Sequence, residues 1–201
     1  MLVLASASPR RSELLTQAGY TFVVHPAHIP EDPLPNEDPL AYVTRLAREK
    51  AEAVFAELSR EWEKEGLGGQ FPQVVLGADT TVAVDGLILG KPEDAADAAR
   101  MLRLLSGRAH CVMTGIAVVS AEATEVAAES TEVTFIELTD QEIAGYIATG
   151  EPMDKAGAYA IQGLAARWIP RIEGCYFNVV GLPIARVSAL LKIPRLPPAS
   201  C

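Results

Sequence analysis

The 201-residue sequence has few of the residues on which several common kinds of site depend. Its three cysteines, Cys111, Cys175 and Cys201, are widely spaced and form no CxxC pair, so we expect a reducing compartment and no disulfide framework. Of its three histidines, His25 and His28 lie in a Pro-rich segment with no third ligand nearby, which argues against zinc. Any chemistry must therefore use carboxylates, lysines and arginines.

Long apolar runs and an excess of positive charge are also missing. No apolar stretch approaches the roughly 20 residues that a membrane-spanning helix needs, and no basic segment precedes the short apolar start, so we expect a cytoplasmic protein. Asp and Glu number 26 against 17 Lys and Arg, giving a formal net charge of −9. This balance disfavours binding to a nucleic-acid polymer, and a polyanionic ligand would need a local basic pocket.

The hydrophobic pattern alternates between strand and helix spacing, which predicts a single mixed α/β domain over 1–193 with a tail at 194–201. Asp79 is expected to break one strand, and Asp85-Gly86 to turn a hairpin. Thr139 and Glu142 form a predicted capping box. Strands are predicted at 2–5, 20–24, 74–84, 110–120, 130–138 and 176–180, and helices at 9–18, 40–66, 93–105, 139–149 and 183–192.

The stretch LASASPRRSELL places two arginines where a helix begins. Ser8 suits the N-cap and Pro9 the first turn, yet Arg10 and Arg11 follow immediately. Cations at a helix N-terminus typically cost about 0.3–1 kcal/mol. The pattern is understandable if the turn binds a highly charged anion such as a triphosphate, because arginine suits phosphate geometry. The alternative is that both are solvated surface arginines.

Three other polar positions could carry chemistry. Asp79 in GADTTV follows an apolar run, where a carboxylate could hold Mg²⁺ or accept a proton from water, although aspartate also ends strands by capping turns. Lys91 in GKP precedes a helix and could lie near a phosphate, or be an ordinary surface lysine. Lys50 lies on the long amphipathic helix, where a solvated face is the alternative.

The stretch DKAGAYAIQG, residues 154–163, is rich in small residues that allow a ligand to approach the backbone closely. Gln162 can donate and accept at once, as the N3–H and O4 edge of uracil or thymine requires. The alternative is a tight loop that carries an ordinary exposed glutamine.

Taken in order, these stretches resemble the Maf family of nucleotide pyrophosphatases. The similarity covers LASASPRRSELL, LAREKA, GADTTVAVDGLILGKP, LSGRAHCVMTGIAV, STEVTF, YIATGEPMDKAGAYAIQG and YFNVVGLPIARV, which span nearly the whole chain. The resemblance implies an elongated mixed sheet flanked by helices, a central substrate cleft and often a homodimer. It also implies hydrolysis of nucleoside triphosphates to monophosphate and pyrophosphate with Mg²⁺ or Mn²⁺. AGAYAIQG resembles the branch that acts on dTTP and UTP.

The resemblance also assigns roles to particular residues. Asp79 matches the proton acceptor, and Glu31, in Pro30-Glu31-Asp32 where an Asp-Glu pair is usual, matches a metal-associated glutamate, so Glu31 and Asp79 are the expected metal ligands. The expected phosphate-binding residues are Ser6, Arg10, Arg11, Lys50 and Lys91. The positions tied to base choice are Arg10, Thr80 and Gln162.

Two other functions remain open from the sequence. One is a pyrophosphatase for 7-methyl-GTP or inosine-type nucleotides, which a panel of substrates would identify. The other is a non-catalytic nucleotide-binding regulator of septum formation, whose biology would not depend on Asp79.

Overall fold

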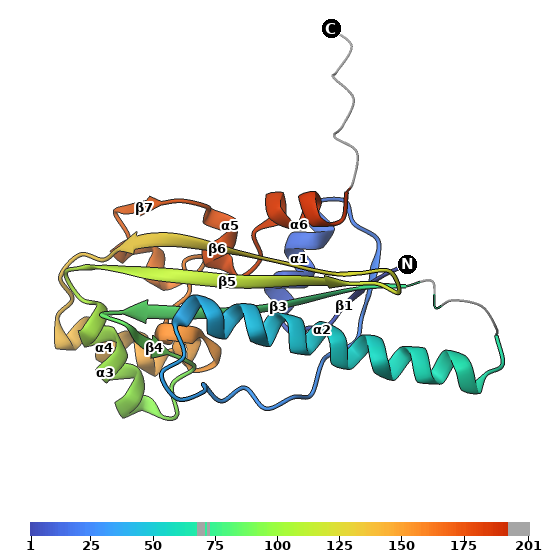
Figure 1. Ribbon diagram of the computed structural model, residues 1–201. Coiled ribbons are helices and arrows are strands. Elements are labelled where there is room, and N and C mark those ends of the chain that lie inside the picture. Colours follow the sequence, from blue (N-terminus) through green and yellow to red (C-terminus); the bar gives the residue numbers. More distant parts are fainter. Residues whose placement is uncertain (68–70, 72, 193–201) are drawn as a thin grey trace, which may run out of the picture.

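The computed structural model describes residues 1–67, 71 and 73–192, and its centre is one mixed seven-stranded sheet (Figure 1). The strand order is β2-β1-β3-β5-β6-β7, with β4 paired to β3. No helix of the described residues is long and apolar enough to cross a membrane. The strands are β1 (Leu2–Leu4), β2 (Phe22–Val24), β3 (Val74–Val84), β4 (Leu87–Leu89), β5 (Ala109–Val119), β6 (Thr124–Thr134) and β7 (Arg171–Glu173).

Helices cover both faces of the sheet (Figure 1). The α-helices are α1 (Pro9–Gln17), α2 (Pro39–Lys64), α3 (Ala95–Leu105), α4 (Asp140–Ala148), α5 (Tyr176–Val180) and α6 (Ile184–Leu190). Three short 3-10 helices lie between α4 and β7, namely η1 (Glu151–Asp154), η2 (Ala156–Ala158) and η3 (Leu164–Trp168). This arrangement confirms the predicted α/β class, and the predicted tail with Cys201 lies outside the described residues.

Strand pairing is parallel at one edge and antiparallel across the rest. β1 pairs in parallel with β2 and β3, and β3, β5, β6 and β7 follow one another in antiparallel pairs. The alternating side chains of the strands separate two apolar layers. Val3 and Val75 pack toward α2, whereas Leu4 and Leu76 pack toward α1 and α6.

Two glycines set how closely α2 lies on the sheet. A Cβ at Gly77 would lie 2.1 Å from the carbonyl oxygen of Ala47, and one at Gly115 would lie 2.2 Å from that of Val43. Both contacts are with helix backbone, so only glycine permits this separation. The close approach brings side chains of the middle of α2 to the strand residues beside these glycines.

Several local predictions are confirmed. Thr139 and Glu142 form the predicted capping box at the start of α4. Asp85 and Gly86 turn the β3–β4 hairpin with φ of 50° and 78°, as a two-residue hairpin turn requires. The predicted antiparallel pairing of the two long strands appears as β5 with β6.

Two local predictions are wrong. The predicted strand at 176–180 is helix α5, because the buried Asn178 amide donates to Val112 O and Thr131 Oγ1, both at 2.9 Å, from a helical backbone. The predicted break at Asp79 does not occur, since β3 runs through it and pairs with β5 there. Ser8 occupies the N-cap of α1 and Pro9 its first turn, as predicted, although the Ser8 side chain makes no capping hydrogen bond.

Candidate active site

A cleft opens where one edge of β3 lacks a strand neighbour. β1 pairs with residues 74–76 of β3 and β4 with residues 82–84, and no strand of the described residues pairs with 77–81 on that edge. The cleft there has a volume of about 580 Å³. Every site residue predicted from the sequence lines it: Ser6, Arg10, Arg11, Glu31, Lys50, Asp79, Thr80, Lys91 and Gln162.

Two carboxylates at the cleft share one ammonium group. Lys50 Nζ lies 2.6 Å from Asp79 Oδ1 and 2.7 Å from Glu31 Oε1. Lys50 and Asp79 are both buried, so the interpretation of Lys50 as a solvated surface lysine is wrong. Gly77 and Gly115 make this possible, because α2 must lie close to the sheet for Lys50 to reach the strand residue Asp79.

The two carboxylates differ in their proton affinity. Burial raises the pKa of Asp79 above its ordinary value, and the nearby charges of Lys50 and Arg11 only partly offset this. Partial burial acts in the same direction at Glu31, but the hydrogen bond and charge of Lys50, together with the charge of Lys91, lower its pKa below the ordinary value. Asp79 is therefore the better proton acceptor of the pair.

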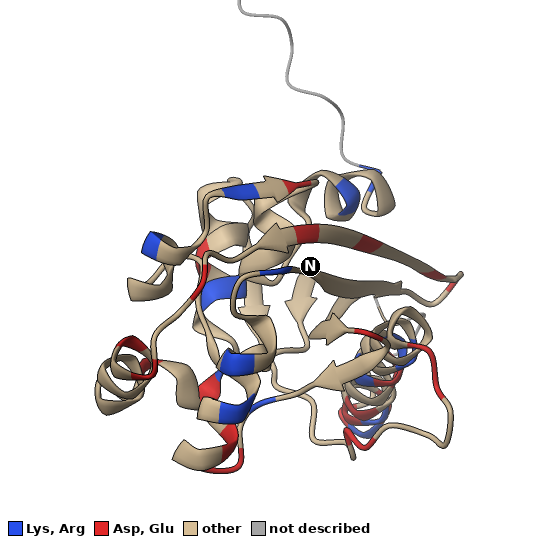
Figure 2. Cartoon of the chain, turned by 90° about the vertical axis from the view of Figure 1, so that its left-hand side faces the viewer, with Lys and Arg blue, Asp and Glu red and all other residues tan. Residues whose placement is uncertain are grey.

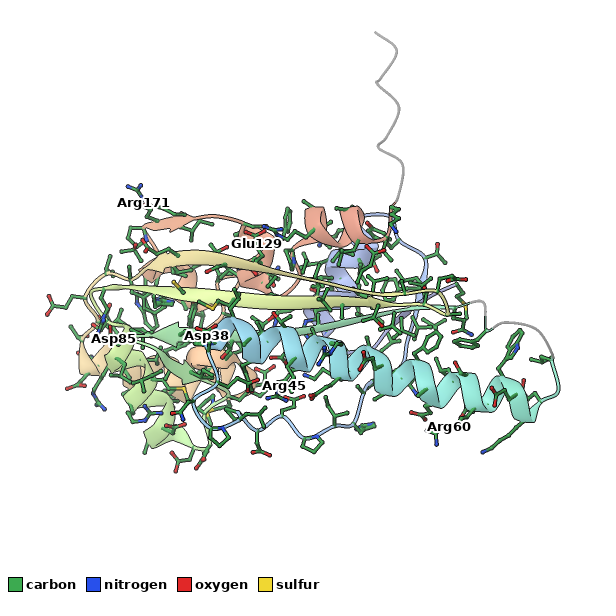
Figure 3. All side chains as sticks on the ribbon, in the orientation of Figure 1. Asp38, Arg45, Arg60, Asp85, Glu129 and Arg171 are labelled. Atoms are coloured by element: carbon green, nitrogen blue, oxygen red, sulfur yellow. The ribbon has the colours of Figure 1, made fainter. Side chains whose placement is uncertain are left out.

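The Pro-rich segment that carries Glu31 is fastened to α2. Tyr42 Oη donates to the carbonyl oxygen of Glu31 at 2.8 Å, and Arg45 Nη2 donates to that of Asp32 at 3.1 Å. Arg45 Nε also donates to Glu37 Oε1 at 2.6 Å. Arg45 lies near the start of α2 (Figure 3). These contacts place Glu31 without regular secondary structure.

The guanidinium of Arg11 is hydrogen-bonded to other groups of the protein. Its guanidinium donates to Gly181 O, Ser6 Oγ and Ala78 O at 2.9 Å and to Thr80 Oγ1 at 3.0 Å. It is buried, so the alternative of a solvated surface arginine is wrong for this residue. Burial lowers the pKa of Arg11, although arginine stays protonated in proteins. It supplies positive charge while joining the start of α1 to β3 and the α5–α6 turn.

The Thr80 hydroxyl is also hydrogen-bonded within the protein. The Thr80 hydroxyl lies 2.9 Å from Thr114 Oγ1 and has Gly181 O as a further acceptor at 3.4 Å, and Thr114 Oγ1 donates to Asn178 O at 3.1 Å. Thr80 accepts from Arg11 as well. Thr114 and Asn178 were missed by sequence reasoning, since their roles depend on contacts between distant strands and helices.

Two basic side chains are less constrained. Lys91 is exposed at the cleft, and among the residues that the structure describes the Arg10 side chain forms only a 3.7 Å ion pair with the exposed Asp154. The first turn of α1 adds backbone N–H groups that have no acceptor within the helix. Basic and acidic segments are interspersed over the fold in Figure 2, and the cleft brings basic and acidic side chains together in its lining.

Glu31 and Asp79 fit a hard divalent cation. Glu31 comes from the Pro-rich segment and Asp79 from β3, yet both carboxylates lie within 2.7 Å of Lys50 Nζ, so they meet around one cationic group. Mg²⁺ commonly binds one or two carboxylates and completes its shell with substrate phosphates. In the part of the chain that the structure describes, no group of three or more His, Cys, Asp or Glu could hold a metal. The fit therefore depends on phosphate oxygens from the ligand.

The chain is similar to known proteins over nearly its whole length. The family model for Maf-like protein matches residues 1–193. Relatives named dTTP/UTP pyrophosphatase include those of Koribacter versatilis, 53% identical over 95% of this chain and 93% of that protein, and Citrifermentans bemidjiense, 54% identical over 96% and 94%. Another, from Anaeromyxobacter dehalogenans, is 50% identical over 98% and 95%. The chain belongs to the Maf family.

Proposed function

We propose that this chain is a nucleoside triphosphate pyrophosphatase that hydrolyses dTTP and UTP to the monophosphate and pyrophosphate. The observation that carries the proposal is the buried Asp79 carboxylate, paired with Lys50 beside Glu31 in a cleft that also presents basic groups. The names of the relatives at 50–54% identity support the choice of substrate. A homodimer, a cytoplasmic location and the identity of the cation stay predictions.

The triphosphate is bound by the basic groups that the protein leaves available. Arg10 and Lys91 contact its oxygens, and the first-turn N–H groups of α1 donate hydrogen bonds to them. Arg10 exchanges its long contact with Asp154 for the phosphate. Arg11 adds charge and holds Ser6 and Thr80 in place. Gln162 pairs with the N3–H and O4 edge of the base.

In the chemical step, water attacks the α-phosphorus and Asp79 accepts its proton. The new bond joins the water oxygen to the α-phosphorus, the bond to the bridging α–β oxygen breaks, and pyrophosphate leaves. Lys50 holds the Asp79 carboxylate in place and stabilises its anionic form. Glu31 and Asp79 would hold Mg²⁺ or Mn²⁺, which neutralises charge on the phosphates when bound.

Replacement of Asp79 by Asn tests this directly. A general base contributes typically about 10²–10⁴-fold, so Asp79→Asn should lower kcat for dTTP by that factor while the fold survives. Asp85→Asn is the matched control, because Asp85 is an exposed hairpin residue whose φ of 50° asparagine also accepts. Pyrophosphate release with Mg²⁺ or Mn²⁺ is measured for dTTP, UTP, CTP, 7-methyl-GTP and ITP. Full activity in Asp79→Asn would contradict the mechanism, and turnover of another nucleotide would contradict the substrate.

A further inference from the structure

The segment between β2 and α2 carries Glu31 to the cleft without regular secondary structure. Its residues 25–38 include four prolines, which have no backbone N–H group to donate. Within the segment, the Glu37 N–H donates to the carbonyl oxygen of Leu34 at 3.1 Å and closes a turn. The position of Glu31 therefore depends on contacts between this segment and the elements beside it.

Arg45, near the start of α2 (Figure 3), supplies such contacts through one guanidinium. It pairs with both carboxylate oxygens of Glu37, from Nε to Oε1 at 2.6 Å and from Nη2 to Oε2 at 2.7 Å. Nη2 also donates at 3.1 Å to the carbonyl oxygen of Asp32, the residue after Glu31. Glu37 Oε2 in turn accepts the Leu34 N–H at 2.9 Å. Arg45 thus joins both ends of residues 32–37 to α2.

The geometry of the Arg45–Glu37 pair favours a real contribution to stability. A planar guanidinium matches the two oxygens of a carboxylate, and the two side chains are only 16% and 8% exposed. Exposed ion pairs usually contribute little, and bidentate arginine–carboxylate pairs are the exception. Arg45 Nη1 also donates to Glu49 Oε2 at 3.1 Å, which orients the guanidinium along α2.

Glu31 is held at its backbone and at its carboxylate. Tyr42 Oη donates to its carbonyl oxygen at 2.8 Å, and Lys50 Nζ lies 2.7 Å from its Oε1. The guanidinium carbon of Arg45 lies 5.7 Å from the centroid of the Tyr42 ring, so Arg45 also contacts the side chain that holds the Glu31 backbone. Because both ends of Glu31 are held, a shift of the segment moves its carboxylate relative to Lys50 and Asp79.

We propose that Arg45, together with Glu37, is a positioning residue that keeps the Glu31 carboxylate beside Asp79 and so sets the affinity of the site for a divalent cation. This inference depends on the proposed function, in which Glu31 and Asp79 would hold that cation. Neither Arg45 nor Glu37 is among the described residues that line the cleft, so both act through Glu31. Replacing the residue that orients a metal ligand typically costs about 10–100-fold in metal affinity.

The test compares Arg45→Met with Arg48→Met, an exposed control on the same helix that pairs with Glu52 at 4.0 Å. For each protein, dTTP hydrolysis is measured over a range of Mn²⁺ concentrations. Binding of Mn²⁺ in the presence of a non-hydrolysable dTTP analogue is followed separately by electron paramagnetic resonance. In Arg45→Met the half-saturating Mn²⁺ concentration should rise about tenfold in both measurements, with kcat at saturating Mn²⁺ within about threefold of wild type.

Two milder variants keep the test decisive if Arg45→Met does not fold. Arg45→Lys retains the charge without the bidentate geometry, and Glu37→Gln retains an acceptor oxygen without the charge. Both should raise the half-saturating Mn²⁺ concentration in the same direction by a smaller factor. The unfolding midpoint of every variant is measured alongside.

A double variant separates positioning of Glu31 from a general structural role. Glu31→Gln removes the carboxylate that Arg45 is inferred to position, so adding Arg45→Met to it should change Mn²⁺ affinity by less than about twofold. A residue that merely supports the fold would lower Mn²⁺ affinity by the same factor with and without the Glu31 carboxylate.

The outcomes separate the two proposals. If wild-type protein hydrolyses dTTP and all the Arg45 and Glu37 variants keep its Mn²⁺ affinity, the inference is overturned while the proposed function stands. An equal loss of Mn²⁺ affinity in the Glu31→Gln background, or a lowered unfolding midpoint alone, also overturns the inference. If wild-type protein hydrolyses neither dTTP nor UTP, the proposed function fails and the inference fails with it.

Discussion

Replacement of Gly115 by alanine perturbs the contact that places Lys50 against Asp79. The new Cβ would lie 2.2 Å from Val43 O and 2.4 Å from Val43 C, both backbone atoms of α2, where ordinary contact begins at about 3.4 Å. The helix must therefore move away by about 1 Å. Overpacking of this kind costs about 1–3 kcal/mol of unfolding free energy. Because Lys50 is about two helical turns beyond this contact, on the same face of α2, its 2.6 Å bond to Asp79 is disturbed as well.

Activity should fall further than stability alone explains. A displacement of about 1 Å at a catalytic group can cost about 10²-fold in rate, so we expect a loss of this order in kcat for dTTP at a temperature where the variant is folded. Gly145→Ala is the control, since Gly145 lies in helix α4 with nothing within 4 Å of a new Cβ, and alanine should stabilise it by about 1 kcal/mol. Denaturant unfolding and pyrophosphate release are measured on both. Wild-type stability and rate in Gly115→Ala would refute the reasoning.

Two further predictions concern stability. Burial lowers the pKa of His110 from 6.5 to about 4, so the folded protein keeps it neutral while the unfolded chain binds a proton as the pH falls through 6.5. The contribution of neutral His110 to the free energy of unfolding is fully present above pH 6.5 and is lost toward pH 4. In denaturant titrations we expect the wild-type protein to lose about 2 kcal/mol of unfolding free energy between pH 7 and pH 5, and His110→Gln to lack this loss. Identical pH slopes in the two proteins would contradict this. Thr139→Ala removes the capping box of α4 and should cost about 1 kcal/mol in the same assay, and no change would show that the cap is not needed.

Local signals in the sequence predicted much of the fold. The capping box at Thr139 and the Asp85-Gly86 turn depend on residues close together in the chain, and both are confirmed. The prediction for residues 176–180 was wrong because their apolar, aromatic and β-branched character favours a strand. Asn178 overrides this preference through hydrogen bonds to Val112 and Thr131, which are 66 and 47 residues away in sequence.

The sequence predicted which residues line the site better than it predicted what each of them does. The residues expected from motif and resemblance all line one cleft, but nothing in the sequence indicated that the Arg11 guanidinium would donate to groups as far as 170 residues away. Lys50 looked like a solvated lysine, because nothing in its own helix indicates that Gly77 and Gly115 allow the helix to approach the sheet. Such contacts arise only once the whole sheet is assembled.

The most direct test of the central claim is pyrophosphate release from dTTP by wild-type protein and Asp79→Asn, followed across pH. The account predicts selective turnover of dTTP and UTP by the wild type, with an acid limb above the ordinary aspartate pKa of 3.8, because burial raises the pKa of Asp79. It predicts a loss of about 10²–10⁴-fold in the variant. Equal turnover by both proteins, or none by the wild type with either Mg²⁺ or Mn²⁺, would contradict it.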